Sequence, residues 1–178
     1  MSLIYQPAED SYLLESVIKL YVKDKSVLDM GSGSGILAES ALRNGAKSVT
    51  AVDINQDSIK ILKNKKINAI KSNLFEKVHK SKKFDIILFN PPYLPEDKRE
   101  DKVSSLATTG GKRGDEIIIK FLEQAPKHLN NGGIILLLLS SLTPQDKILK
   151  LIGKQSLKHK LIASKKIFFE ELFVWEIS

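Results

Sequence analysis

The chain has 178 residues, with 28 Lys plus Arg against 21 Asp plus Glu, so its formal net charge at pH 7 is +7. This length fits one domain with its own core, and the lack of cysteine excludes a disulfide scaffold, thiol catalysis and any Cys-ligated metal site. The histidines are too scattered to predict a metal site, and the apolar runs are too short to predict a membrane span, so we expect a cytoplasmic protein. The positive charge comes mainly from lysine and fits a solvated surface as well as a nucleic-acid partner.

Apolar periodicity and turn residues predict alternating helices and strands. A helix over residues 8–22 is followed by a buried strand over 26–30, a helix over 36–42, a strand over 48–53, a helix over 56–66 and a strand over 68–72. The apolar run at 84–89 predicts a fourth strand, and the polar stretch 94–111 is typical of a functional loop. A helix over 115–128, a strand over 133–139, a helix over 144–152 and two strands over 157–163 and 168–177 complete the chain.

This order predicts an α/β fold with a mostly parallel sheet and helices on both faces. The two final strands, which have no helix between them, add an antiparallel strand at one edge. We expect a single domain over 1–178, in which 1–24 is a helical lead-in and 25–178 forms the sheet and its helices.

Three glycines, Gly31, Gly33 and Gly35, stand at alternate positions between the first strand and the next helix. Glycine there lets the backbone turn tightly and approach a ligand closely. Asp53 ends the following strand, where it can accept hydrogen bonds from ribose hydroxyls, and Asp29 before the turn suits a cationic ligand better than a pyrophosphate. The other interpretation is a tight structural turn beside a surface carboxylate.

Asp-x-Gly-x-Gly-x-Gly followed by an acidic strand end resembles the first two motifs of the S-adenosylmethionine-dependent methyltransferases. The resemblance implies a Rossmann-like, seven-stranded, mostly parallel sheet with one antiparallel strand near the C-terminal edge. It also implies S-adenosyl-L-methionine as the cofactor.

The sequence Asn90-Pro91-Pro92-Tyr93, called the NPPY turn below, follows the fourth strand. An amide or aromatic amine is a poor nucleophile, and the Asn90 side-chain carbonyl and the Pro91 backbone carbonyl can accept its N–H groups and aim its lone pair. Tyr93 can stack on a planar acceptor. We therefore expect Asn90, Pro91 and Tyr93 to be catalytic and Pro92 to bind substrate with them; taken alone, the turn would be a Pro-Pro strand terminator.

The stretch from Tyr5 to Tyr12, with Pro-Ala-Glu-Asp-Ser, and the Gly110-Gly-Lys-Arg-Gly-Asp-Glu116 stretch resemble the HemK family of release-factor glutamine methyltransferases, in its short eukaryotic and archaeal branch. The resemblance implies methylation of the Gly-Gly-Gln glutamine of a class 1 peptide chain release factor. It assigns cofactor contacts to Ser11, Asp29, Gly31, Gly33, Gly35, Asp53, Asn73, Leu74 and Asn90. Asn73 stands where the family has Asp, and Ser11 where it has Thr.

The same resemblance implies a heterodimer with a small zinc-binding activator subunit that covers an edge of the sheet, and the 68–72 strand would lie at such an edge. Gly110 and Gly111 also fit simple loop punctuation, and Lys112 and Arg113 a solvated pair. The 94–109 loop is rich in charged residues and has few apolar anchors, so we expect it to be mobile without substrate.

Two alternatives remain open. A DNA or RNA exocyclic-amine methyltransferase (adenine N6 or guanine N2) would also use an NPPY turn, but the catalytic fold takes up the whole length and leaves no target-recognition domain. A cofactor-binding scaffold without activity would have no need of an acceptor site. We therefore expect that nucleic acid is not required.

Overall fold

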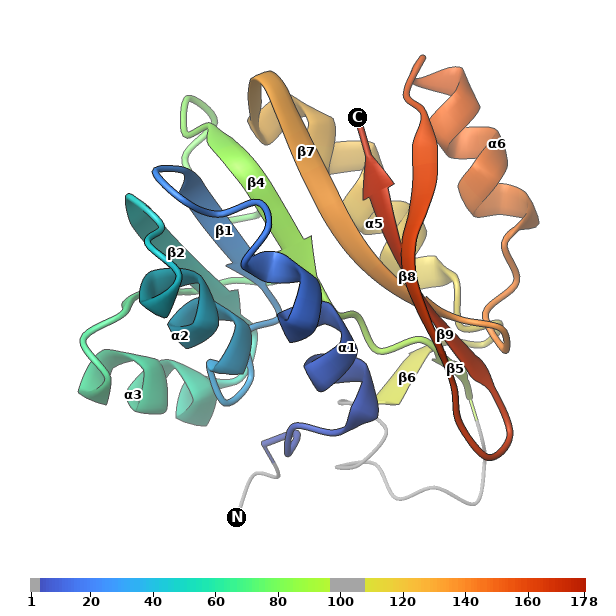
Figure 1. Ribbon diagram of the computed structural model, residues 1–178, viewed down its shortest axis with the longest axis horizontal. Coiled ribbons are helices and arrows are strands. Elements are labelled where there is room, and N and C mark those ends of the chain that lie inside the picture. Colours follow the sequence, from blue (N-terminus) through green and yellow to red (C-terminus); the bar gives the residue numbers. More distant parts are fainter. Residues whose placement is uncertain (1–3, 97–107) are drawn as a thin grey trace.

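The structure, a computed structural model, describes residues 4–96 and 108–178. Over these residues seven strands form one sheet in the order β3-β2-β1-β4-β7-β9-β8 (Figure 1). Its strands are β1 (Ser26–Met30), β2 (Ser48–Asp53), β3 (Asn68–Lys71), β4 (Phe84–Phe89), β7 (Leu129–Ser140), β8 (His159–Lys166) and β9 (Glu171–Ile177). The helices are α1 (Glu9–Ile18), α2 (Ile36–Arg43), α3 (Gln56–Asn64), α5 (Glu116–Gln124), α6 (Asp146–Lys154) and the short 3₁₀ helix η1 (Ala125–His128).

The direction of the strands confirms the predicted fold class. The pairs β3–β2, β2–β1, β1–β4 and β4–β7 are parallel, whereas β9 pairs antiparallel with both β7 and β8. Within the described part of the chain, β9 is thus the one reversed strand, and it lies next to the edge strand β8.

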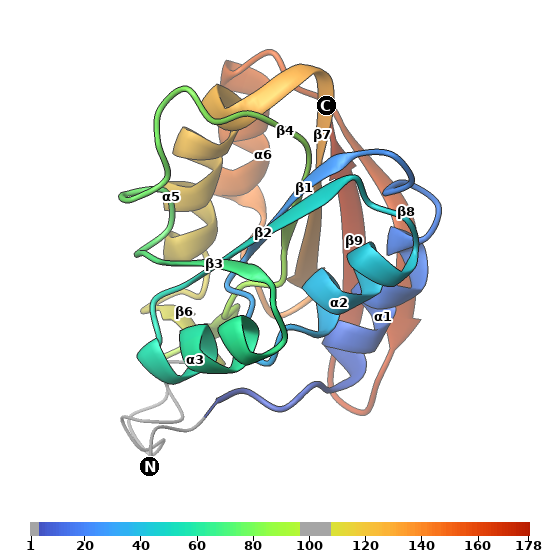
Figure 2. The same cartoon turned by 90° about the vertical axis from the view of Figure 1, so that its left-hand side faces the viewer.

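Helices cover both faces of the sheet, as Figure 2 shows with the sheet seen nearly edge-on. Side chains from α1, α2 and α3 pack on one face together with alternate residues of the strands. Side chains from α5 and α6 pack on the other face. The central strands are therefore buried on both sides, which explains why they appear as continuous apolar runs in the sequence.

The order of the strands sets where a ligand can bind. From β1 the chain moves outward through β2 to β3 and then returns to β4 on the other side of β1. Loops after β1 and β4 therefore leave the sheet in opposite directions and open a crevice at its carboxyl edge. The two predicted motifs, the glycine turn after β1 and the NPPY turn after β4, both lie at this crevice, where the strand order reverses.

Several predicted boundaries are wrong. The helix expected over 115–128 divides into α5 and η1 at Pro126, because proline lacks the N–H that a continuing α-helix needs. The strand expected from 133 begins at Leu129, which pairs with Phe84 across an irregularity in the β4–β7 register. The ends of the predicted 94–111 loop pair with each other as β5 (Leu94–Pro95) and β6 (Thr109–Gly111), and its residues 97–107 lie outside the described residues.

Candidate active site

A tight glycine turn joins β1 to α2 at the carboxyl edge of the sheet. Gly31, Gly33 and Gly35 have φ angles of 66°, 52° and 89°, a region that residues with a Cβ rarely adopt. A Cβ added to Gly31 would lie 3.5 Å from the ring of Phe89 and 4.0 Å from the backbone oxygen of Asn90. The glycine turn therefore lies directly against the start of the NPPY turn.

Asp53, at the end of β2, is tied to this turn. Its Oδ2 accepts a hydrogen bond from the backbone N–H of Gly33 at 2.7 Å, and its Oδ1 accepts one from Asn55 at 2.7 Å. Its backbone oxygen accepts a hydrogen bond from Ser72, the first residue after β3, at 2.9 Å. Burial raises the pKa of Asp53 above its usual value. The ends of three neighbouring strands are thus brought together around Asp53.

Asp29 is a second, fully buried carboxylate beneath the turn. Its Oδ2 accepts a hydrogen bond from the backbone N–H of Ala38 at 3.1 Å, and its Oδ1 is buried without a hydrogen-bond partner in the described structure. Burial, which outweighs the opposing hydrogen bonds, raises the pKa of Asp29 to about 7. A buried carboxylate oxygen without a partner is unfavourable unless a donor arrives, so the site is suited to a cationic ligand.

Asn90 is held in one orientation by α1. Its Nδ2 donates a hydrogen bond to Oδ2 of Asp10 at 3.0 Å and contacts Oγ of Ser11 at 3.4 Å. An ionised carboxylate accepts hydrogen bonds but cannot donate them, so the NH₂ side of the amide must face Asp10. Oδ1 of Asn90 is buried and has no hydrogen-bond partner in the described structure. It is therefore available to accept an N–H from a substrate.

Asp10 and Tyr5 are two residues of this site that were not predicted from the sequence. The Tyr5 hydroxyl donates to Oδ2 of Asp10 at 2.9 Å, the same oxygen that accepts from Asn90. A sequence signal existed, because Asp10 stands four residues before Leu14 on the apolar stripe of α1, where a charged residue is unusual. Asp10 therefore holds the side-chain amide of Asn90 in position.

Replacing Asp10 with asparagine is expected to lower kcat about tenfold, because an amide at position 10 no longer fixes which side of the Asn90 amide faces it. The Km for the acceptor and the affinity for the cofactor should stay close to wild type, and Asp10→Glu should recover part of the lost rate. Steady-state kinetics on both variants check this, with Glu15→Gln, a surface change on the same helix, as the control. Equal loss of rate and of thermal stability would show a purely structural role.

The glycine-rich 110–114 loop packs on the backbone of the NPPY turn. A Cβ added to Gly110 would clash with the carbonyl oxygen of Gly114 and lie 2.7 Å from the backbone oxygen of Pro92. A Cβ on Gly114 would lie 2.5 Å from the backbone oxygen of Tyr93. Arg113, between them in sequence, is exposed and forms ion pairs of 3.0 Å with Asp115, just before α5, and of 2.9 Å with Asp146, the first residue of α6. The glycines therefore allow the loop to pack closely against the NPPY turn, and Arg113 anchors the loop.

Replacing Gly110 with alanine is expected to shift the NPPY turn and lower the rate of transfer about a hundredfold, with a loss of about 1–3 kcal/mol in unfolding free energy. Gly153→Ala is the matched control, because a Cβ there meets nothing within 4 Å and glycine is unfavourable inside a helix. Kinetics and urea unfolding of the two variants compare the effects. A Gly110→Ala protein with wild-type kcat would show that the loop does not support the turn.

The remaining predicted residues are placed less centrally. Asn73 is exposed, and its Nδ2 donates to Oε1 of Glu76 at 2.9 Å. Leu74 is half-buried with a left-handed φ of 47°. A Cβ on Gly35 would come within 2.8 Å of Leu62. Gly35 therefore serves the packing of α2 against α3, whereas Asn73 and Leu74 follow Ser72 at the rim of the crevice.

The NPPY tyrosine is half-buried. Burial, followed by the negative charges of Asp10 and Glu170, raises the pKa of Tyr93 well above its usual value, so its hydroxyl stays protonated. Its backbone oxygen accepts a hydrogen bond from Oγ1 of Thr143 at 3.2 Å. Contacts from α1, from the 110–114 loop and from Thr143 thus fix the NPPY turn.

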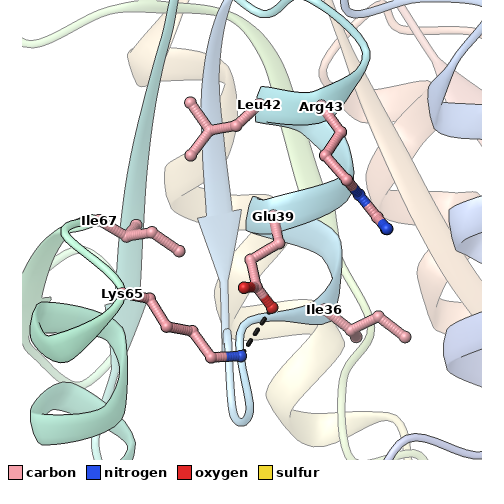
Figure 3. Close-up of a pocket in the computed structure, with 6 residues that line it drawn as sticks. All are labelled: Ile36, Glu39, Leu42, Arg43, Lys65 and Ile67. Atoms are coloured by element: carbon pink, nitrogen blue, oxygen red, sulfur yellow. Dashed lines mark hydrogen bonds and ion pairs between the residues drawn. The ribbon is translucent and has the colours of Figure 1, made fainter.

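A separate groove of about 290 Å³ lies between α2 and the turn from α3 to β3 (Figure 3). Its lining residues are Ile36, Glu39, Leu42, Arg43, Lys65 and Ile67. Lys65 and Glu39 form an ion pair of 2.6 Å across it. None of the predicted site residues lines this groove, so it is distinct from the crevice.

Among the helices of residues 4–96 and 108–178, none combines the length and the hydrophobicity of a membrane-spanning helix. Over the same ranges, no three His, Asp or Glu side chains gather into a set that could hold a metal ion.

Comparison with known proteins identifies the family. The chain matches the methyltransferase small domain family over residues 9–168. A candidate protein N5-glutamine methyltransferase of Methanocaldococcus jannaschii is 41% identical, over 96% of this chain and 89% of that protein. The release factor glutamine methyltransferase of Rhodopirellula baltica is 29% identical over 78% of this chain, which spans about half, 54%, of that protein's length.

Solved structures show the same fold. The Mtq2–Trm112 complex of E. cuniculi, described as responsible for methylation of the eRF1 translation termination factor, matches with a TM-score of 0.79 at 24% identity and covers 97% of this chain and 96% of the matched one. The family match spans most of the sequence and the archaeal relative covers nearly all of it. The chain therefore belongs to the methyltransferase small domain family, as a member of its HemK-type group of glutamine methyltransferases.

Proposed function

We propose that the chain transfers a methyl group from S-adenosyl-L-methionine to the side-chain nitrogen (N5) of a protein glutamine. The observation that carries this proposal is the oriented amide of Asn90, whose Oδ1 is a buried acceptor without a partner in the described structure, on a residue whose backbone lies beside the glycine turn. The name of the archaeal relative supports the same acceptor.

The crevice fits the proposed cofactor. Asp29 has a buried carboxylate oxygen without a hydrogen-bond partner, which suits the cationic amino group of the cofactor. The positive φ angles of Gly31 and Gly33 let the backbone approach a ligand closely, and Asp53 lies where a ribose can donate to it. Ser11 and Asn90, which contact each other, would border the same space, and Asn73 and Leu74 would lie toward the adenine. When bound, the cofactor supplies an electrophilic methyl group.

The residues of the NPPY turn prepare the acceptor. The nitrogen of a glutamine side chain is weakly nucleophilic because its lone pair is delocalised into the carbonyl. Oδ1 of Asn90 and the backbone oxygen of Pro91 would each accept one of its N–H groups, which directs the lone pair along one line and stabilises positive charge as it develops on nitrogen. The fixed backbone of Pro91 and Pro92 holds this geometry, and Tyr93 would stack on the planar amide.

We infer that the acceptor is the Gly-Gly-Gln glutamine of a class 1 peptide chain release factor, in line with the names of the bacterial relatives. Purified protein is incubated with methyl-labelled cofactor and one of four acceptors: the release factor, its glutamine-to-alanine loop variant, duplex DNA or total RNA. Label is expected in the release factor alone. Label in nucleic acid and none in the factor would favour an exocyclic-amine methyltransferase.

One of the two edges of the sheet, strand β3, supports a partner subunit. In the described structure β3 pairs only with β2, so one side of β3 offers unpaired backbone groups. We propose that a small zinc-binding subunit adds to this edge, as the E. cuniculi structural neighbour is itself part of a complex. Co-expression followed by gel filtration tests for a heterodimer.

A further inference from the structure

Two phenylalanine rings protrude from the turn between β8 and β9, residues 167–170, called the hairpin tip below. Phe168 is 97% exposed and Phe169 is 90% exposed, and their ring centroids lie 5.8 Å apart. The backbone N–H of Ile167 donates to the oxygen of Glu170 at 2.9 Å, which closes the turn, and Ile167 itself packs against the core. The tip therefore presents two adjacent aromatic rings on a closed turn. Adjacent exposed apolar side chains of this kind commonly mark an interaction site.

The hairpin tip lies at the same edge of the sheet as the crevice. Because β9 is antiparallel to both β7 and β8, and β7 is parallel to β4, the ends of β8 and β4 point the same way. Figure 1 shows the β8–β9 turn at the bottom of the view, together with β5 and β6. The tip thus flanks the NPPY turn from the side opposite α3.

Two sets of contacts tie the tip to the acceptor site. On one side Lys165, at the end of β8, forms an ion pair with Glu9, the neighbour of Asp10. On the other side Ser140 donates to the carboxylate of Glu170, and Ser141 and Glu171 exchange hydrogen bonds of 2.8 Å and 2.9 Å.

The segment that carries these serines continues directly to the catalytic turn. Thr143 follows two residues after Ser141, and its hydroxyl donates to the backbone oxygen of Tyr93. The charge of Glu170 also acts on Tyr93. The tip is therefore held in a fixed relation to the place where the acceptor must bind.

We propose that the hairpin tip docks the folded protein that carries the acceptor glutamine, with Phe168 and Phe169 inserting into an apolar surface of that protein beside its acceptor loop. This proposal rests on the function proposed above. One glutamine side chain in the crevice cannot distinguish one protein from another, so recognition requires contacts outside it. Aromatic rings on a closed turn supply such contacts with little loss of conformational freedom.

The charges around the rings favour a protein over a phosphate-rich partner. Lys165 and Lys166 precede the two rings, but Glu170 and Glu171 follow the rings directly, and Lys165 is already paired with Glu9. The local charge therefore balances, which would give little attraction to nucleic acid or to an anionic lipid surface.

A crosslinking experiment tests the contact directly. The chain contains no cysteine, so Phe169→Cys introduces a single thiol at the tip, to which benzophenone maleimide can be attached. Irradiation with the purified release factor is expected to crosslink the tip to the domain that carries Gly-Gly-Gln. Leu20→Cys, an exposed apolar position beyond the far end of α1, is the matched control and should give no crosslink. Crosslinks from Leu20→Cys alone, or from neither variant, would contradict the proposal.

A kinetic experiment measures the contribution. In the Phe168→Ser/Phe169→Ser double variant, Km for the intact factor is expected to rise about tenfold or more, since burial of even one phenyl ring is worth that much. The value of kcat, the cofactor affinity and transfer to a short Gly-Gly-Gln peptide should stay within about twofold of wild type, because the crevice is unchanged. Leu20→Ser serves as the control.

The outcomes separate this proposal from the proposed function. An unchanged Km for the factor, with transfer still occurring, overturns docking by the tip and leaves the methyltransferase assignment in place. Two other results, each with unchanged Km, also overturn docking by the tip. Loss of vesicle binding in the double variant assigns the rings to a membrane, and loss of self-association assigns them to a second copy of the chain. If the wild-type protein transfers no methyl group to the factor, both proposals fail.

Discussion

Replacing Asn90 with alanine is expected to lower the rate of methyl transfer to a glutamine acceptor about 10²–10³-fold, while the affinity for S-adenosyl-L-methionine changes little. The variant removes Oδ1, the buried acceptor that would hold the substrate N–H. It leaves the glycine turn and both carboxylates beneath it in place. The loss should therefore appear in kcat rather than in the cofactor binding constant. Single-turnover kinetics and cofactor titration on the same preparation measure the two quantities.

Asn44→Ala is the matched control, because Asn44 caps the end of α2 with hydrogen bonds to Ser40 and lies outside the crevice. It should lower stability slightly and leave kcat unchanged. If Asn90→Ala reduces cofactor affinity as much as it reduces the rate, Asn90 is mainly a cofactor contact and the acceptor role is wrong.

Replacing Asp29 with asparagine is expected to weaken cofactor binding about a hundredfold, because the buried carboxylate would lose its charge pairing with the cationic ligand. The same change should stabilise the protein without ligand at alkaline pH. Burial raises the pKa of Asp29 to about 7, so the folded protein holds this proton more tightly than the unfolded chain does. That contribution to the unfolding free energy is complete below about pH 4 and is lost as the pH rises through 7.

Asparagine does not ionise. The unfolding free energy of Asp29→Asn minus that of wild type should therefore increase by about 3 kcal/mol from pH 5 to pH 8. Urea unfolding at the two pH values measures this gain, and cofactor titration at pH 8 measures the affinity. Glu39→Gln removes a negative charge from the surface of α2 and should change neither quantity appreciably. A pH profile that is identical in Asp29→Asn and wild type would show that the carboxyl titrates normally.

The sheet could be predicted from the sequence because its central strands are buried on both faces. β1, β2 and β4 begin and end at the predicted residues, each being a short apolar run between turn residues. Prediction failed where pairing overrides local composition. The run from Asn130 to Gly133 reads as a turn, yet it joins β7, where Nδ2 of Asn130 donates to Asp85 at 2.7 Å. Similarly, Phe168 and Phe169 favour a strand by composition but lie in the β8–β9 turn.

The candidate site divides in the same way. The glycine turn, Asp53 and the NPPY turn were predictable because each is a local motif at the end of a strand. The contact of Asp10 with Asn90 joins residues 80 positions apart, so no local pattern reports it. The support that Gly110 and Gly114 give to the NPPY turn depends on close approach of two backbones, which becomes visible only when both loops are placed.

The burial of Asp29 has a consequence for the heat of ligand binding. Because burial raises its pKa to about 7, this carboxyl is partly protonated at neutral pH. A cationic ligand that pairs with the ionised form would expel that proton into the buffer. The binding enthalpy measured by calorimetry should therefore differ between phosphate and Tris at pH 7, in proportion to the ionisation enthalpies of the two buffers, and that difference should shrink as the pH is raised.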